Sequence, residues 1–477
     1  MNAIPIALFW GLAAWGIASP KPVLIYLFFA TIPLGTLAVL PPAITGGLTF
    51  TATPIVSLLI IARAFVNRSG PPAFLTLAIL PQRLMLLTLF WFVAVITTIF
   101  MPRIFQGSVM VVPMRGILST TSPLRPTSQN FSQLVYITIS IMSVFAFTHI
   151  LRSRQMRQHA LQALCLGGLV TITTGALDFA SQFMPITPLL QPFRTATYAL
   201  LTDVEVMGSK RVVGLMPEAS SFGGTCLAFL STIYFYRRAI ADVRFQKVYA
   251  PPLLGLLLVF CWLSKSSGTY VGLAVFAIMA LLEWFLRINS SERNGAIYRR
   301  GLGGEMSFMA LAITAILLAV MFRPDILDPI YSLIDRMVFQ KGSSVSYEER
   351  GMWRSVALAS LRETYGLGVG MGGTRASSSA VSVFSSTGVI GGMLFYAFVL
   401  QCFLRGTRKA TAETRLILAA FRFSFMPGFV TALMVGDADF GGLPAFGFGI
   451  VTALAIYQET TVRRSAVQSA PNSFSKS

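Results

Sequence analysis

Long apolar segments recur along most of the chain and constrain its fold more than any other feature. Residues 85–100, MLLTLFWFVAVITTIF, contain no charge, and a helix that crosses a bilayer needs about 17–25 residues of this kind. Only 12% of the 477 residues are charged, whereas a soluble globular protein has about 25%. We therefore expect an all-α, polytopic helical bundle that lies in the lipid bilayer.

The number of spans follows from counting apolar windows. We expect about thirteen transmembrane helices, within a range of twelve to fourteen because the N-terminal windows are crowded. The expected spans are 3–18, 22–43, 47–66, 80–102, 132–151, 160–180, 221–238, 250–264, 268–287, 305–322, 384–404, 412–433 and 440–457.

Loop charge predicts the orientation. Lys and Arg gather in alternate loops, which are 151–159, 237–247, 287–301, 405–415 and 462–464. Positive loops face the cytoplasm, so we expect a multi-pass membrane protein with a cytoplasmic C-terminus; in a bacterium the opposite side is the periplasmic face. The net charge of +19 has the same cause, and no nucleic acid is expected as a partner. The basic loops themselves are expected to be a solvated face beside anionic lipid and not a site.

The chain divides accordingly into helices and two large external, periplasmic loops. Loops longer than about 12–15 residues without repeats are usually functional, so we expect any chemistry in these two. The expected units are N-terminal helices 1–180, a first loop 181–220, central helices 221–322, a second loop 323–383, C-terminal helices 384–460 and a disordered tail 461–477.

The first loop ends in RVVGLMPEASSFGG, residues 211–224, which enters a span. Arg211 and Glu218 lie where an unpaired charge is expensive, so both are candidates for a site. The alternatives are an arginine that snorkels to the interface and an acid that complements a helix dipole. Lys265, in the short turn LSKSSGTY, is either an interfacial lysine or a further phosphate contact.

The second loop contains a predicted helix over 346–364, from the N-cap Ser346 to a stop at Gly366. Arg350 and Arg354 share a face of this helix, and two guanidinium forks suit a phosphate or diphosphate. The alternative is intrahelical pairing with neighbouring glutamates. Tyr347 and Trp353 on the same helix are candidate ligand contacts. The helix is too apolar to lie free in water, so we expect it to pack against the bundle.

The segment GVGMGG, residues 368–373, matches GxGxxG but follows no strand, which argues against a dinucleotide site. We expect a tight turn whose backbone amides are available to an oxyanion, with Arg375 lining the same cavity. Asp178 is a weak site candidate, and Asp437 and Asp439 are expected to be structural. No cluster of ligating residues predicts a metal, and no cofactor is expected.

These motifs, in this order, resemble the bacterial O-antigen polymerase and O-antigen ligase superfamily, including Wzy-like exopolysaccharide polymerases. The resemblance rests on RVVGLMPEASSFGG, LSKSSGTYVGLAVF and SYEERGMWRSVALASLRETYGLGVGMGG, and it covers about residues 205–405. It implies a GT-C-like, metal-independent, inverting glycosyltransferase that acts on undecaprenyl-diphosphate-linked oligosaccharides at the periplasmic face. A polysaccharide chain-length regulator, or co-polymerase, is an implied partner.

Residue roles follow from the resemblance by position. The arginines of the family's two large loops match Arg211 and Arg350, with Arg354 nearby, and its acid matches Glu218. Ligases of the superfamily have a His soon after the glycine-rich turn, where this chain reads ASSSAVSVFSSTG. The missing His favours a polymerase. A ligase-type transferase and a lipid-linked saccharide transporter or flippase remain the alternatives.

Overall fold

The chain is mostly helical in its computed structural model, which describes residues 3–115, 120–198, 200–206, 209–289, 303–307, 311, 314, 321–322, 345–406 and 411–468. The principal helices are α1 (Ala3–Ala18), α2 (Val23–Thr31), α3 (Ala52–Val66), α4 (Gly70–Ile79), α5 (Met85–Ile104), α6 (Ser128–Ile150), α7 (Arg154–Ala180), α9 (Ala219–Tyr236), α10 (Ala250–Leu263), α11 (Ser267–Ile288), α15 (Val345–Glu363), α16 (Ser379–Leu404), α17 (Ala412–Val435) and α18 (Leu443–Gln468).

Short elements connect these helices. They are α8 (Thr187–Leu190), the 3-10 helices η1 (Gln191–Phe193) and η2 (Arg237–Ala239), and the π-helix η3 (Phe245–Tyr249). Two small antiparallel hairpins complete the set, β1 (Met110–Val111) with β2 (Ser122–Pro123), and β3 (Glu205–Val206) with β4 (Ser209–Lys210).

Seven helices in the described part of the chain are long and apolar enough to cross a membrane. They are α5, α6, α7, Phe245–Leu263, α11, α16 and α17. Shorter apolar helices occur at Ala3–Ala18, Ala52–Val66, Gly70–Ile79 and Leu443–Ile456. A largely helical chain with several candidate spans agrees with the sequence, but the count of thirteen is not confirmed. Most of the expected span 305–322 lies outside the described residues.

The expected span 22–43 is wrong as a single helix. The helix α2 ends at Thr31, and an irregular segment follows as far as α3. Pro33, Gly35, Pro41 and Pro42 account for the break, since proline removes a backbone donor and clashes with the preceding turn. Hydropathy alone could not detect this, because the irregular residues are themselves apolar.

The C-terminal helix α18 extends to Gln468, through 461–468 of the segment expected to be a disordered tail. No proline or glycine interrupts the chain there before Pro471, so the helix continues. The remaining residues, 469–477, lie outside the described part.

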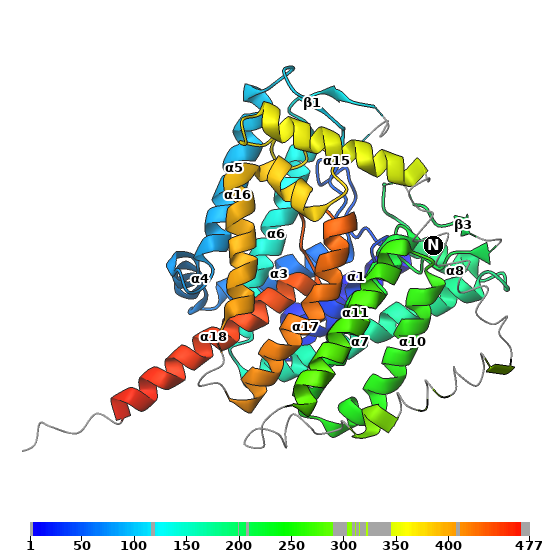
Figure 1. Ribbon diagram of the computed structural model, residues 1–477, viewed down its shortest axis with the longest axis vertical. Coiled ribbons are helices and arrows are strands. Elements are labelled where there is room, and N and C mark those ends of the chain that lie inside the picture. The colour runs from blue at the N-terminus through cyan, green and yellow to red at the C-terminus, as the bar shows by residue number, and fades with distance from the viewer. Residues whose placement is uncertain are drawn as a thin grey trace, which may run out of the picture.

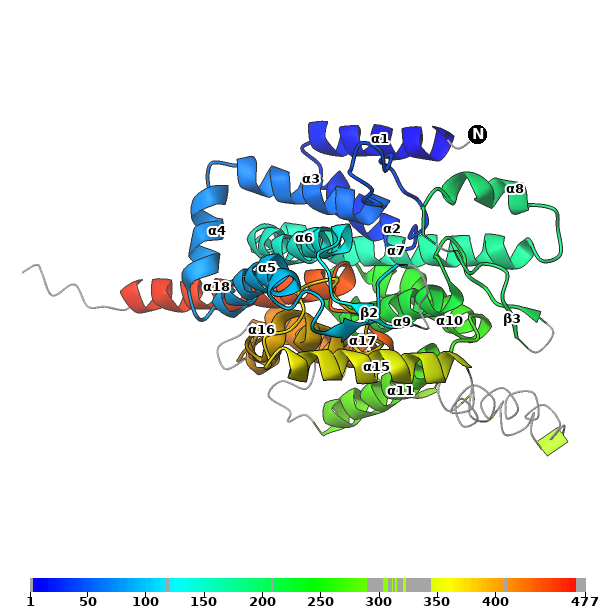
Figure 2. The ribbon, with the colours of Figure 1, turned by 90° about the horizontal axis from the view of Figure 1, so that it is seen from above.

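The expected external loops meet at one end of the bundle. The helix α15 lies across this end, and both hairpins lie there as well (Figure 1). Hydrogen bonds join the loops, since the Arg375 backbone N donates to Val112 O at 2.9 Å and the Asn130 side-chain Nδ2 donates to Met371 O at 2.9 Å. Seen from above, α15 lies on the side of α11, α16 and α17, whereas α1 and α3 lie on the other side (Figure 2). We call this end the α15 end.

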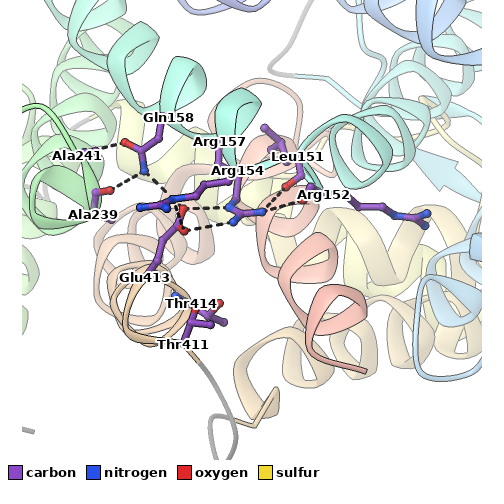
Figure 3. A network of polar contacts seen from close by, with 10 residues as sticks. All are labelled: Leu151, Arg152, Arg154, Arg157, Gln158, Ala239, Ala241, Thr411, Glu413 and Thr414. Atoms are coloured by element: carbon purple, nitrogen blue, oxygen red, sulfur yellow. Dashed lines mark hydrogen bonds and ion pairs between the residues drawn. The ribbon is translucent and has the colours of Figure 1, made fainter. Parts of the chain in front are cut away.

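The expected cytoplasmic loops meet at the opposite end, which we call the Glu413 end. The Glu413 carboxylate lies 3.2 Å from Arg157 and 3.3 Å from Arg154, and the Gln158 amide donates to Ala239 O at 2.9 Å (Figure 3). The 27 residues of α7 connect the two ends and span about 40 Å at 1.5 Å per residue. The charge pattern therefore sorted the loops into two sets that the fold keeps apart.

Small residues bring α9 close to α7. A Cβ atom at Gly167 would lie 2.5 Å from the Phe229 ring, and one at Gly175 would lie 2.5 Å from the Phe222 ring. Both rings are fully buried. Glycine at these positions lets the α9 aromatics pack directly on the α7 backbone, which is a common device between membrane helices. This packing sets the position of the N-terminus of α9, where Glu218 lies.

Candidate functional site

A buried carboxylate holds the turn that carries Arg211 and Glu218. Asp178, near the C-terminus of α7, is fully buried and accepts hydrogen bonds from Val213 N at 2.7 Å and Gly214 N at 3.1 Å. Gly214 has φ +59°, a conformation that favours glycine. The Arg194 guanidinium lies 3.4 Å from the second carboxylate oxygen. All of its contacts are within the protein, so Asp178 serves to fix this turn.

The turn between α10 and α11 lies against Arg211. The Arg211 Nε donates to Ser264 O at 3.1 Å, and the half-buried side chain is held by this bond. Lys265, with φ +45°, donates from its Nζ to the Ser209 hydroxyl. Burial lowers the pKa of Lys265, and the Arg211 charge lowers it further. Arg211 and Lys265 therefore lie close together in the fold.

The helix expected at 346–364 is confirmed as α15 and packs against the bundle, with Ala357, Ser360 and Thr364 buried. Its Trp353 ring lies under the Arg375 guanidinium, 4.4 Å from ring centroid to Cζ. The Ser377 hydroxyl donates to Arg350 O at 2.9 Å. Trp353 therefore orients an arginine of the following loop.

Two arginines, Arg211 and Arg375, lie within electrostatic reach of Glu218, and Arg350 lies within reach of both arginines. Burial lowers the pKa of Arg211, the Glu218 charge raises it, and the Arg350 charge lowers it. Burial also lowers the pKa of Arg375. The charges of Asp437 and Glu218 raise this pKa, and the charge of Arg350 lowers it. Arg211 and Arg375 thus both lie within electrostatic reach of Glu218 and Arg350.

These charges are neighbours without being paired. Within the described part of the chain, no ion pair of 4.0 Å or less joins Arg211, Arg350 or Arg375 to an acid. The Arg350 guanidinium likewise has no hydrogen-bond partner there. Glu218 is the N-cap residue of α9, but its carboxylate accepts a bond from the Ser220 hydroxyl and caps no backbone N–H. The arrangement leaves guanidinium N–H groups available to an anionic ligand.

Two expected contacts lie outside this group. Arg354 is exposed on α15, and Tyr347 is 55% exposed. Arg350 and Arg354 differ in burial although they are four residues apart, because the helix presents only its Arg350 side to the bundle. A helical-face argument could not distinguish the two.

The expected oxyanion turn at GVGMGG is wrong. Its amides are used within the protein, since Val369 N donates to Ser385 O at 2.8 Å, Gly370 N to Ser386 O at 3.0 Å and Met371 N to the Thr98 hydroxyl at 3.0 Å. The two serine carbonyls lie just before a break in α16 at Gly388, which has φ +72°. The glycine-rich turn therefore supplies donors to the carbonyls that the break in α16 leaves free. The amides of Val369, Gly370 and Met371 are not available to a ligand.

Asp437 was expected to be structural, but its charge also acts on Arg375, one of the arginines near Glu218. It acts on Arg375 and accepts a bond from the Ser382 hydroxyl at 2.8 Å. Asp437 and Asp439 are the only acids in the loop between α17 and α18, which is the sequence signal that could have identified them. Asp439 is bonded to the Ser140 hydroxyl at 2.5 Å, and burial raises the pKa of its carboxyl.

Both acids line a cavity of about 160 Å³ between α9, α16, α17 and α18. Its wall is largely apolar, and Asp437, Asp439 and Ser379 lie on its α15 side. Among its aromatic lining residues are Phe395, Tyr396, Phe425, Phe429 and Phe440. The cavity reaches Tyr236 at the far end of α9, so it extends from Asp437, which acts on Arg375, into the apolar interior.

No protein-family model matches the chain, and no curated protein matches it either. The chemistry is therefore argued from the geometry. Three arginines, a lysine and an unpaired glutamate, linked through Asp437 to an apolar cavity, suit a ligand that carries phosphate on an apolar chain.

Proposed function

We propose that this protein is a polysaccharide polymerase. It joins undecaprenyl-diphosphate-linked oligosaccharide repeat units at the periplasmic face of a bacterial inner membrane. One observation carries the proposal. Arg211 and Arg375 lie within electrostatic reach of Glu218 and of Arg350 at one end of the bundle, and Asp437, which acts on Arg375, lines a cavity of aromatic side chains. The resemblance of the motifs to O-antigen polymerases points in the same direction.

The proposed reaction forms one C–O bond and breaks another. A hydroxyl of the acceptor repeat unit attacks the anomeric carbon of the lipid-linked chain from the face opposite the diphosphate. The bond from that carbon to the diphosphate oxygen breaks, and undecaprenyl diphosphate leaves with the bonding electrons. Glu218 takes the proton of the attacking hydroxyl as general base. The anomeric configuration is inverted.

Stabilising the leaving group is the main task, because negative charge develops on the diphosphate. Arg211 and Arg350 bind it from two sides, and Arg375 is held in place by Trp353. Lys265 adds positive charge beside Arg211. The cavity between α9 and α17 takes part of the isoprenoid chain, which its aromatic wall matches in polarity.

A pair of arginines on α15 provides the test. In a strain of the source organism that lacks the gene, Arg350→Ala should abolish long-chain polymer while single repeat units remain. The loss of one such donor costs about 100-fold in rate. Arg354→Ala, one turn away and exposed, is the matched control and should retain long chains. Arg211→Ala should behave like Arg350→Ala, and Glu218→Gln should slow turnover without preventing substrate binding.

The profile of the surface polysaccharide separates the alternatives. Full-length lipid-linked polymer that accumulates in the deletion strain would indicate a ligase, and single units held on the cytoplasmic leaflet would indicate a flippase. Normal chain length in both the Arg211→Ala and Arg350→Ala strains would refute the diphosphate site.

A further inference from the structure

The Glu413 end of the bundle contains arginines that lack an acidic partner. Glu413 pairs with Arg154 and Arg157, and these two side chains converge on it (Figure 3). Arg152 comes from the same turn but points away from Glu413 (Figure 3). Its Nε and Nη2 atoms are buried and have no hydrogen-bond partner. The available carboxylate is therefore shared by two arginines, and a third is left without one.

A second unsatisfied guanidinium lies at the end of α16. Arg405 is only 8% exposed, and its Nη2 donates to Arg83 O at 3.0 Å. Its Nε and Nη1 atoms are buried without a partner. Arg83 lies in the turn between α4 and α5. Burial lowers the pKa of Arg152 and the Arg83 charge lowers it further, so Arg83 lies close to both other arginines.

Three positive charges thus gather where the α4–α5 turn, the α6–α7 turn and the end of α16 meet. None of the three forms an ion pair with an acid among the residues that the structure describes. A buried guanidinium with unfilled N–H groups is costly. An oxyanion would remove this cost, because planar guanidinium forks match the oxygen atoms of a phosphate group.

The surroundings favour a lipid over a soluble anion. Leu80, beside the Arg83 turn, is 38% exposed, and Leu404, which precedes Arg405, is 71% exposed. Both belong to the ends of apolar helices, where headgroups meet the hydrocarbon region. Acyl chains would cover these leucines while the phosphate met the arginines, and basic pockets between membrane helices bind anionic headgroups in this way.

We propose that Arg83, Arg152 and Arg405 bind the phosphate group of an anionic phospholipid. This site lies at the opposite end of the bundle from Glu218 and does not depend on the polymerase proposal. It also goes beyond the expectation from the sequence that the basic loops are only a solvated face.

The test uses the full-length protein in an uncharged detergent. Thermal unfolding is followed by tryptophan fluorescence while phosphatidylglycerol, phosphatidylcholine or inorganic phosphate is titrated. Phosphatidylglycerol should raise the unfolding temperature of the wild type, and phosphatidylcholine should not. Arg152→Gln should weaken this response about fivefold, which is the usual contribution of one arginine near anionic lipid. The Arg152→Gln/Arg405→Gln pair should weaken it further.

Arg103→Gln is the matched control, because Arg103 lies at the other end of α5 and is exposed. It should respond to phosphatidylglycerol as the wild type does. Arg152 also separates a ligand site from a structural role. Its side-chain nitrogens Nε and Nη2 bond to no protein atom, so Arg152→Gln should be at least as stable as the wild type without lipid.

Three results decide the proposal. An unchanged response to phosphatidylglycerol in Arg152→Gln and in the double variant would overturn it. The proposal would also be overturned if Arg152→Gln were less stable than the wild type by the same amount with and without lipid. If inorganic phosphate alone stabilises the wild type and this is lost in Arg152→Gln, the arginines bind phosphate but a soluble ligand replaces the lipid.

Discussion

Replacing Asp178, near the C-terminus of α7, with Asn should destabilise the protein far more than replacing any exposed acid of the loop that follows α7. The Asp178 carboxylate accepts bonds of 2.7 and 3.1 Å from two backbone amides on one oxygen, and Arg194 lies 3.4 Å from the other. Asn keeps a carbonyl oxygen for the amides but turns its NH₂ group toward the guanidinium. Arg194 is then a buried charge without a partner.

The expected loss follows from this geometry. Removing one member of a buried ion pair costs about 3–5 kcal/mol, or about a hundredfold or more in the folding equilibrium. Asp203→Asn is the matched control, since Asp203 pairs with Lys210 at 2.9 Å in the same loop but is 81% exposed. An exposed pair contributes about 0–1 kcal/mol.

Unfolding measured by circular dichroism, in mixed micelles with an increasing fraction of SDS, would compare the two variants. The reasoning is refuted if Asp178→Asn lies within about 1 kcal/mol of Asp203→Asn, since a buried pair and an exposed pair would then be equivalent.

Three further predictions concern stability. Gly370→Ala should destabilise the protein by about 1–3 kcal/mol, because Gly370 has φ +80° and a Cβ there would lie 2.9 Å from Thr98 Cα; Gly255→Ala in α10, with open space, should not. Thermal unfolding compares the two. Burial raises the pKa of the Asp439 carboxyl, so its contribution to stability is present at low pH and lost as pH rises above about 4. Asp439→Asn should remove this loss, which unfolding temperatures measured between pH 4 and 7 would test. If the wild type and Asp439→Asn showed the same dependence on pH, the prediction would be contradicted. Glu413→Gln should cost about 3 kcal/mol because it takes the carboxylate away from the buried Arg157, whereas Arg154→Ala, at a 74% exposed side chain, should cost under about 1 kcal/mol; equal costs in chemical unfolding would contradict this.

Apolar windows and loop charge predicted much of the architecture. Helices such as α5 and α16 occur where the windows place them, and the helix α15 follows from its stop signal at Gly366. The basic loops and the loops with candidate site residues are at opposite ends. These features depend on residues close together in the sequence, which is why pattern reasoning reaches them.

The remaining features depend on contacts between distant residues. The irregular segment after α2 is as apolar as a span, so only its prolines distinguish it. The amides of Val369 and Gly370 donate to carbonyls that are free because α16 is broken. The sequence of the glycine-rich motif does not reveal that break. Asp437 acts on Arg375 only because the packing of α17 and α18 brings the loop between them close to Arg375.

The junction between the glycine-rich turn and α16 constrains the order of biosynthesis. The Ser385 and Ser386 carbonyls would lack donors in hydrocarbon until Val369 and Gly370 dock on them. Met371 in turn bonds to Thr98, which is synthesised some 270 residues earlier. This side of α5 can therefore complete its contacts only after the second large loop has been synthesised. A chain truncated before residue 366 would contain α5 but lack the glycine-rich turn that packs on it. That side of α5 would then be exposed to quality-control proteases.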